Sequence, residues 1–188
     1  MVKITAIKEA LKALFKPATT KYPHGPATHV PPGLRGLPQF NEEKCIGCGA
    51  CAASCSAKAI SMEDKGKSRT LSISYVRCIF CGRCEDICPE EGITLSDKFE
   101  LTTTDKDQAT IIIEFDLVPC EKCGSLVSTP QHLEKIRTRI MENIDPRVAD
   151  EVTKDLSQYL NLCIECRRKL CYQLNTHPQK YYSRRWEE

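Results

Sequence analysis

The sequence predicts an α+β fold in which one cysteine-rich module is followed by a smaller unit that also contains cysteines. Three observations lead to this prediction. Two cysteine runs of equal spacing begin at Cys45 and Cys78. A segment that alternates apolar and polar residues precedes the second run, and an isoleucine-rich segment precedes the next cysteine pair, and both are typical of β-strands. Apolar residues at helical spacing mark one segment near the N-terminus and two more toward the end of the chain.

The two cysteine runs share the pattern C-x₂-C-x₂-C-x₃-C. This is the spacing of bacterial two-cluster ferredoxins, in which three cysteines of each run bind one [4Fe–4S] cluster and the fourth crosses to the other cluster. A tight loop can reach three corners of the cube, so a distant cysteine supplies the fourth. We therefore expect two [4Fe–4S] clusters, cluster 1 on Cys45, Cys48, Cys51 and Cys88, and cluster 2 on Cys78, Cys81, Cys84 and Cys55.

The likeness of the two runs extends beyond their cysteines. At the offset that separates Cys45 from Cys78, Gly49 matches Gly82, and residues 60–62 (Ile-Ser-Met) match residues 93–95 (Ile-Thr-Leu). Such self-similarity at a fixed offset indicates a duplicated unit, here a cluster-binding half that occurs twice.

One difference between the halves follows the fourth cysteine, where the first run has Ser56 and the second has Pro89. Serine keeps a backbone N–H that proline lacks. One hypothesis is that this N–H bonds to the Cys55 sulfur and raises the potential of cluster 2. The alternative is that a serine is merely tolerated at this position.

Composition excludes several other uses of the cysteines. Of the 188 residues, 13 are cysteines and 41% are apolar, and the formal net charge is +2. We expect no signal peptide, and low-potential clusters need a reducing compartment, so the chain does not fit a secreted disulfide scaffold. Zinc sites favour paired C-x₂-C units over a run of four cysteines. The charge balance predicts no nucleic-acid partner, and no apolar run approaches the roughly 18 residues that span a bilayer.

The first part of the chain, residues 1–40, is expected to form a helix and an extended arm. Residues 3–16 place apolar side chains on one helical face and lysines elsewhere, and Pro17 ends the pattern. This amphipathic helix fits either a partner protein or an anionic membrane surface. The arm from Pro17 to Pro38 is rich in proline, which favours an extended backbone that lies over a neighbouring subunit.

The second part, residues 41–100, is the two-cluster ferredoxin module. Residues 70–76 alternate apolar and polar side chains and predict a short strand before the second cysteine run.

The third part, residues 101–188, is expected to hold one further metal ion. A strand over residues 110–118 leads into one C-x₂-C pair, a second pair follows later in the chain, and two helices beginning at Pro130 and at Asp145-Pro146 fill the gap. Two such pairs form a tetrahedral site with no open position, which indicates a structural Zn²⁺, although a single iron uses the same geometry. The expected ligands are Cys120, Cys123, Cys163 and Cys166, with Cys171 as a substitute for one of them. The unit is predicted to be zinc-ribbon-like with a helical insertion.

The whole arrangement resembles one family. The amphipathic helix, the proline-rich arm with Leu34-Arg35-Gly36, the motif over residues 78–85 (Cys-Ile-Phe-Cys-Gly-Arg-Cys-Glu) and the C-terminal cysteine pairs occur in this order. The chain resembles the two-cluster ferredoxin subunit of group 4 membrane-bound [NiFe] hydrogenases, including the formate hydrogenlyase type. That subunit is similar in turn to the two-cluster subunit of respiratory complex I, in which the C-terminal cysteine segment is not expected.

The resemblance implies an electron-transfer subunit of an oxidoreductase complex, without a catalytic site of its own. Its electron donor would be an electron-input module or a soluble ferredoxin, its acceptor a small cluster-bearing hydrogenase subunit, and its N-terminal helix would rest against the membrane arm. It would lie peripherally on the cytoplasmic side of the cell membrane. Two alternatives remain open at this stage: a subunit of a complex I-type quinone oxidoreductase, and a free soluble ferredoxin.

Overall fold

The computed structural model describes residues 4–15, 25 and 29–171. Half of the proline-rich arm, residues 17–24 and 26–28, lies outside the described residues. Helices and strands are mixed along the chain, as the sequence predicted. Their order is α1 (Ile4–Phe15), β1 (Pro38–Phe40), α2 (Ala50–Ser54), β2 (Ile60–Lys65), β3 (Ser68–Ser74), α3 (Arg83–Asp86), β4 (Ile93–Leu95), η1 (Asp107–Ala109), β5 (Thr110–Asp116), β6 (Val118–Pro119), β7 (Leu126–Ser128), α4 (Pro130–Glu142), η2 (Pro146–Val148), α5 (Ala149–Tyr159) and α6 (Ile164–Leu170).

The central sheet is antiparallel, with the strand order β2-β3-β5. The strand predicted before the second cysteine run is β3, which pairs over its whole length with β5 on one side and over most of it with β2 on the other. Its side chains alternate between buried and half-buried, as a strand with one covered face requires. Because β5 begins at Thr110, the sheet crosses the boundary that we expected near residue 100.

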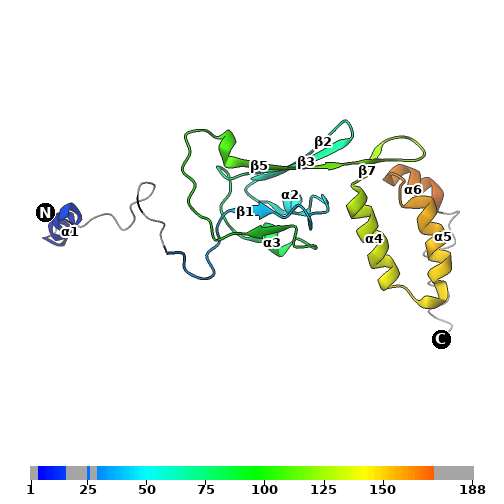
Figure 1. The fold of residues 1–188 in the computed structure, drawn as a ribbon, viewed down its shortest axis with the longest axis horizontal. Coiled ribbons are helices and arrows are strands. Elements are labelled where there is room, and N and C mark those ends of the chain that lie inside the picture. Colours follow the sequence, from blue (N-terminus) through cyan, green and yellow to red (C-terminus); the bar gives the residue numbers. More distant parts are fainter. Residues whose placement is uncertain (1–3, 16–24, 26–28, 172–188) are drawn as a thin grey trace.

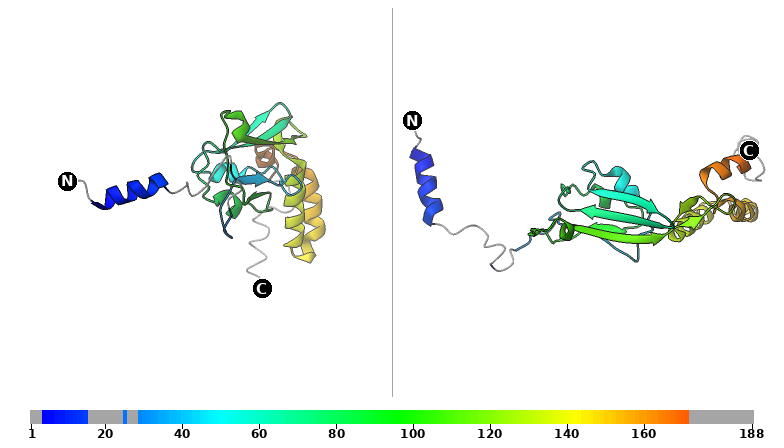
Figure 2. Two further views of the ribbon diagram at one scale, coloured as in Figure 1. Left: turned by 60° about the vertical axis from the view of Figure 1, so that its left-hand side comes forward. Right: turned by 90° about the horizontal axis from the view of Figure 1, so that it is seen from above.

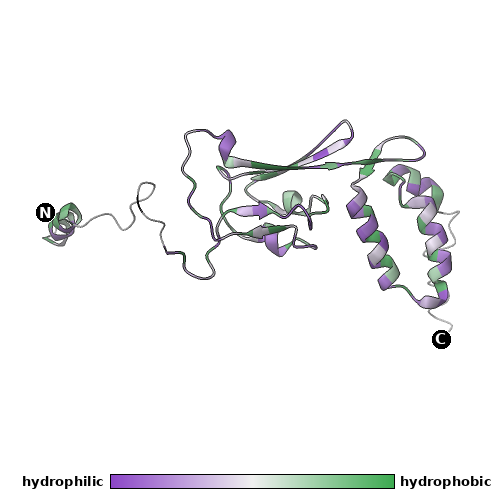
Figure 3. Cartoon of the chain, viewed as in Figure 1, coloured by the Kyte–Doolittle hydropathy of each residue, from purple (hydrophilic) through white to green (hydrophobic). Residues whose placement is uncertain are grey.

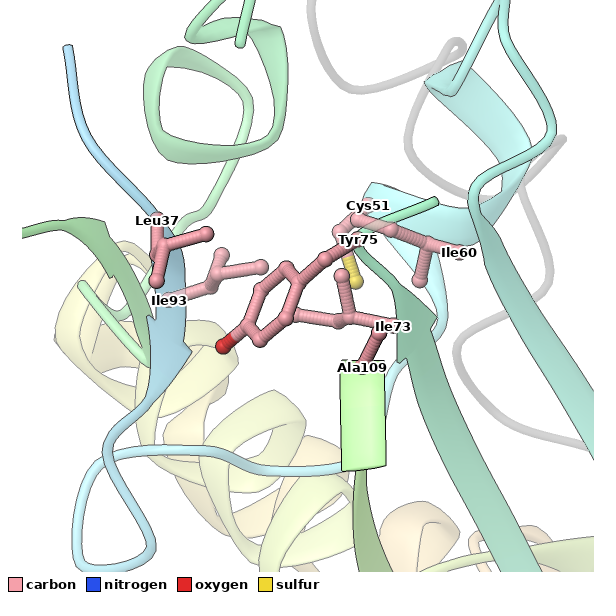
Figure 4. Packing of buried hydrophobic residues seen from close by; sticks show 7 residues of the cluster. All are labelled: Leu37, Cys51, Ile60, Ile73, Tyr75, Ile93 and Ala109. Carbon is pink, nitrogen blue, oxygen red and sulfur yellow. The ribbon is translucent and has the colours of Figure 1, made fainter. Parts of the chain in front are cut away.

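A second, two-stranded sheet pairs β1 with β4 and brings the start of the module next to its end. Between the sheets lies a small core of Leu37, Cys51, Ile60, Ile73, Tyr75, Ile93 and Ala109 (Figure 4). The ring of Tyr75 lies in the middle of this group, and its hydroxyl donates to the Pro38 carbonyl at 2.9 Å. A thin core of this kind fits a module whose cohesion depends on bound metal.

The C-terminal helices α4, α5 and α6 lie at one end of the central sheet, and α1 lies beyond the other end (Figures 1 and 2). Hydrophobic and hydrophilic residues alternate along both α4 and α5, so each helix has an apolar stripe (Figure 3). Helix α4 begins as predicted, with Thr129 as its N-cap and Pro130 in its first turn. The helix expected from Asp145-Pro146 begins as the 3₁₀ turn η2 and continues as α5.

Helix α1 matches the amphipathic helix predicted at the N-terminus, and none of its residues is buried. Ile4, Leu14 and Phe15 are exposed by 73%, 80% and 81%, so a broad apolar face has no partner within the described chain. Among the helices that the structure describes, none is both long and apolar enough to cross a membrane.

Candidate iron–sulfur and metal sites

Two cavities hold the eight cysteines of the duplicated runs. One cavity is lined by Cys45, Cys48, Cys51 and Cys88, which are the residues expected to bind cluster 1. The other is lined by Cys55, Cys78, Cys81 and Cys84, which are the residues expected to bind cluster 2. In each cavity, three cysteines of one run therefore meet the last cysteine of the other run. The structure brings together each set that the spacing predicted.

The backbone repeats its least common conformations at the offset that relates the two cysteine runs. Three pairs of residues with positive φ are related in this way: Gly47 (65°) and Phe80 (54°), Gly49 (77°) and Gly82 (82°), and Lys58 (49°) and Glu91 (51°). A left-handed conformation is uncommon for Phe, Lys and Glu, and it persists where the surrounding structure requires it. The same loop geometry is therefore imposed on different side chains in the two halves, which is the structural signature of a duplicated cluster-binding loop.

Backbone N–H groups point at the cysteine sulfurs in a pattern that also repeats. Ala59 N–H donates to Cys55 Sγ at 3.3 Å, and Gly92 N–H donates to Cys88 Sγ at 3.1 Å, at the same offset as the cysteine runs. Hydrogen bonds to ligand sulfurs are one of the means by which a protein sets a cluster potential. The N–H that reaches Cys55 is thus that of Ala59, and the half with Pro89 has the same bond. This geometry does not support a special role for Ser56.

Burial raises the thiol pKa of two cysteines in each cavity, Cys45 and Cys51 in the first and Cys78 and Cys84 in the second. Desolvation raises the pKa of Cys51 to about 12 and that of Cys84 to about 11, and neighbouring cysteines add to the effect. A thiolate is the form that binds iron. Thiols with a raised pKa become stable thiolates when a strong positive charge lies beside them. Iron supplies that charge, and its binding releases protons. The donor set fits an iron–sulfur cluster in each cavity.

The surroundings of the two cavities differ. A charged arginine on β3, Arg69, is buried, and it bonds to both oxygens of Asp64 and to the Gly47 carbonyl next to cluster 1. On the cluster 2 side, the exposed Arg35 donates to the Cys81 carbonyl at 3.2 Å. Neither arginine was predicted as a site residue, because its partner at the cluster loop lies far away in the sequence.

The four cysteines of the expected C-terminal site also come together. The sulfurs of Cys120, Cys123, Cys163 and Cys166 all lie within 4.8 Å of one another. The first pair sits in a tight turn after β6, where Cys120 N–H donates to the Ser125 carbonyl at 2.7 Å. The second pair lies at the start of α6, with Cys163 as the N-cap. Cys171 is not part of this group, since its sulfur donates to the Arg168 carbonyl at 3.1 Å.

The electrostatics of this group favour a bound cation. Backbone N–H groups, that of Cys163 first, lower the pKa of Cys120 to about 6. The pKa of Cys163 is also lowered, chiefly by the Ser125 hydroxyl. The pKa of Cys166 is raised to about 12, above all by its hydrogen bond with Cys163. Part of the group is thus ready to ionise, while four thiolates this close together require a cation between them.

The chain is similar to known iron–sulfur proteins. The family model of the 4Fe-4S dicluster domain matches residues 44–92. Formate hydrogenlyase subunit 6 of Escherichia coli (strain K12) is 32% identical over 169 residues, which cover 89% of this chain and 89% of that protein. A chain in the structure of the membrane-bound sulfane sulfur reductase, an archaeal respiratory membrane complex, is 33% identical, with a TM-score of 0.37. That match covers 54% of this chain and 56% of the other.

The dicluster match accounts for the two cysteine cavities, and the likeness to subunit 6 extends far beyond it into the helices and cysteine pairs of the C-terminal part. An identity of 32% over nearly nine-tenths of both chains leaves little of either protein unmatched. The chain is therefore an iron–sulfur protein of the ferredoxin type, and it belongs to the family of formate hydrogenlyase subunit 6.

Proposed function

We propose that this chain is an electron-transfer subunit that relays electrons through two [4Fe–4S] clusters within a membrane-bound [NiFe] hydrogenase complex of the formate hydrogenlyase type. The observation that carries the proposal is the pair of cavities, each lined by three cysteines of one run and the last cysteine of the other. The relation to formate hydrogenlyase subunit 6 supports the choice of complex. The hydrogen chemistry would belong to a partner subunit.

In this proposal the ligand sets are those expected from the spacing, Cys45, Cys48, Cys51 and Cys88 for cluster 1 and Cys78, Cys81, Cys84 and Cys55 for cluster 2. A [4Fe–4S] cluster supplies a centre that accepts and releases one electron at a time. The chain itself surrounds both cavities with apolar side chains that exclude water. Phe40 and Leu71 line the first, and Ile60 and Phe80 line the second. Backbone N–H groups then stabilise the charge on the sulfurs.

The C-terminal group is proposed to hold one structural metal ion. Cys120, Cys123, Cys163 and Cys166 would bind Zn²⁺, or a single iron, in a zinc-ribbon-like unit. The core beside them, formed by Leu162 and Leu170 with Cys120, is small, and a bound metal would stabilise it. Metal analysis of the purified chain tests this site. The site would be disproved if the chain contained no zinc and no iron beyond the eight atoms of two [4Fe–4S] clusters.

The three parts of the chain have distinct roles in this proposal. Residues 1–40 attach the subunit to its complex, residues 41–100 carry the clusters, and residues 101–188 supply the strand β5 of the central sheet and the metal-stabilised unit. The apolar face of α1 would rest against the membrane arm of the complex or the lipid surface on the cytoplasmic side. A small cluster-bearing subunit would exchange electrons with this chain.

Affinity purification of the tagged chain from solubilised membranes under anaerobic conditions tests the function. The eluate is analysed for nickel and for hydrogen evolution from reduced viologen. A chain with Cys48→Ser is the matched control, because it should enter the same complex and lose hydrogenase activity with the natural electron donor. Nickel with hydrogenase activity is the expected result.

Two other outcomes would overturn the proposal. A membrane complex without nickel but with quinone reductase activity would assign the chain to a complex I-type enzyme. Recovery of the chain alone, as a soluble iron–sulfur protein, would identify it as a mobile ferredoxin.

A further inference from the structure

The peptide unit between Ile46 and Gly47 is held at both of its ends. Its carbonyl, on Ile46, accepts a hydrogen bond of 2.5 Å from the hydroxyl of Thr129. Its N–H, on Gly47, faces the sulfur of Cys45. One planar peptide therefore lies between the cluster 1 ligand Cys45 and Thr129, which is 83 positions after Ile46 in the chain. If the carbonyl is fixed, the N–H is fixed with it, because the peptide unit is planar.

Thr129 is well placed to hold this peptide. Its relative exposure is 0%, and its hydroxyl oxygen accepts from the His132 N–H at 3.2 Å as the N-cap of α4. Since that oxygen already accepts from the helix, its own hydrogen is free to bond to the Ile46 carbonyl. The threonine methyl lies close to Gly47, since a Cβ added there would be 2.8 Å from it. Two contacts thus determine the position of the peptide.

Other contacts join α4 to the same side of cluster 1. Glu90 forms ion pairs with Lys135 and Arg139 of α4, and the Glu90 side chain is only 12% exposed. It lies two residues after the ligand Cys88. Arg139 also donates to the Pro89 carbonyl at 3.2 Å. Both chain segments that carry cluster 1 ligands are therefore fastened to one helix of the C-terminal unit.

The corresponding peptide at cluster 2 has no such support. Phe80 N–H donates to Cys78 Sγ at 3.4 Å, and it occupies the position in its loop that Gly47 N–H occupies beside Cys45. The Ile79 carbonyl, however, accepts no hydrogen bond from any residue in the described part of the chain. Ile79 is 64% exposed, whereas Ile46 is half-buried. The duplication thus provides an internal comparison, in which one N–H donor is held by α4 and its equivalent is not.

We propose that Thr129 is a positioning residue for cluster 1, which directs the Gly47 N–H at the Cys45 sulfur and thereby raises the reduction potential of that cluster alone. A hydrogen bond to a ligand sulfur stabilises the reduced, more negative state. Because Thr129 is the N-cap of α4, the C-terminal unit acts on cluster 1 through it. The inference rests on the proposed ligand set of cluster 1.

Redox titration of the full-length, cluster-loaded chain, followed by electron paramagnetic resonance, tests the proposal. Thr129→Val removes the hydroxyl and keeps the shape, while Thr129→Ser keeps the hydroxyl. Thr129→Gly removes the hydroxyl but caps a helix nearly as well as threonine, and it serves if the valine variant loads poorly. Asp145→Ala removes a different cap in the same unit and controls for general loosening. Cys48→Ser shows which signal belongs to cluster 1.

The expected result is a lower midpoint for cluster 1 in Thr129→Val and Thr129→Gly, an unchanged midpoint for cluster 2, and wild-type values in Thr129→Ser and Asp145→Ala. Unchanged midpoints in a fully loaded Thr129→Val or Thr129→Gly chain would overturn the inference. So would equal shifts of both clusters, or the same shift in Asp145→Ala. A wild-type chain that binds no iron would instead contradict the proposed function, which keeps the two failures apart.

Discussion

At the scale of single residues, the buried arginine next to cluster 1 shows how the loop is supported. Arg69 gives two hydrogen bonds, of 2.8 and 2.9 Å, to the carboxylate of Asp64 and a third, of 3.0 Å, to the Gly47 carbonyl. A guanidinium with this little exposure needs a carboxylate partner, since an unpaired buried charge is costly. The ion pair therefore holds Arg69 in place, and Arg69 in turn holds the Gly47 carbonyl between the proposed ligands Cys45 and Cys48.

Replacement of Asp64 by asparagine tests this support. We expect Asp64→Asn to lower the free energy of unfolding by about 1–2 kcal/mol, because Arg69 loses its charged partner. The loss is limited to this range because water reaches part of the Asp64 carboxylate and screens the charge of Arg69. Denaturant titration followed by circular dichroism measures the change. Asp116→Asn is a matched control on the same sheet, where the carboxylate is exposed, and it should change stability by less than about 0.5 kcal/mol.

The same pair predicts a pH dependence. The hydrogen bonds and charge of Arg69 lower the pKa of Asp64 below its usual value of about 3.9. A carboxylate with a lowered folded-state pKa stabilises the fold above its unfolded pKa and loses this contribution as the pH falls through the folded value. The difference between wild type and Asp64→Asn should thus stay constant from pH 7 to pH 5 and shrink only below about pH 4. A difference that already shrinks by pH 5 would contradict the assignment.

Glycine at position 47 is expected to be required for two separable reasons. Its φ is +65°, and an added Cβ would lie 2.8 Å from the Thr129 methyl and 3.0 Å from the Phe115 ring. Gly66, with a φ of +59°, has open space around it and isolates the backbone effect. We expect Gly66→Ala to cost about 1 kcal/mol of stability and Gly47→Ala clearly more, since overpacking adds about 1–3 kcal/mol. Equal losses in thermal unfolding would show that the contacts of Gly47 can yield.

The residues of the candidate sites could be predicted from the sequence only where their spacing is local. The cysteine runs form a known motif of local spacing, and that motif predicts which cysteines gather in each cavity, including the one that comes from the other run. Arg69 and Thr129 could not be found in this way. Their partners lie 22 and 83 positions away, and only the folded chain brings them to the loop.

At the scale of elements, local signals predicted the helices better than they predicted the pairing of strands. Proline and a capping residue placed the starts of α4 and η2 correctly, because these residues act within one turn. Helix α6 was not predicted, since its seven residues are too few to show a period. Strand β5 was predicted as a strand, but its pairing with β3 depends on tertiary packing that no local pattern records.

Helix α4 offers the clearest test at this scale. We expect Glu90→Gln to lower the free energy of unfolding by about 1–2 kcal/mol and to speed amide hydrogen exchange in α4, because both of its ion-pair partners are on that helix. Glu63→Gln removes an exposed pair with Lys65 and should have an effect below about 0.5 kcal/mol. Unchanged exchange in α4 of the Glu90 variant would show that other contacts hold the helix in place.

At the scale of the whole molecule, α1 stands apart from the cluster-bearing body, as Figure 2 shows. None of its residues is buried, so the body does not depend on it for packing. We expect a chain without residues 1–15 to bind about eight irons in its two clusters, as the full chain does, and to lose its association with membranes. Iron analysis and membrane fractionation measure the two properties. Loss of iron in the truncated chain would show that α1 contributes to the fold.

The exchange of the fourth cysteine between the two halves has a consequence for biosynthesis. In the proposed ligand sets, the first cluster inserted into the nascent subunit also draws in the run that must receive the second. Delivery of one cofactor would thus prepare the acceptor for the next, and removal of either would expose to oxidation one cysteine within the run that binds the other. Assembly factors would then meet this subunit chiefly in two forms, empty and fully charged, and a half-filled form would be a short-lived substrate for repair or degradation.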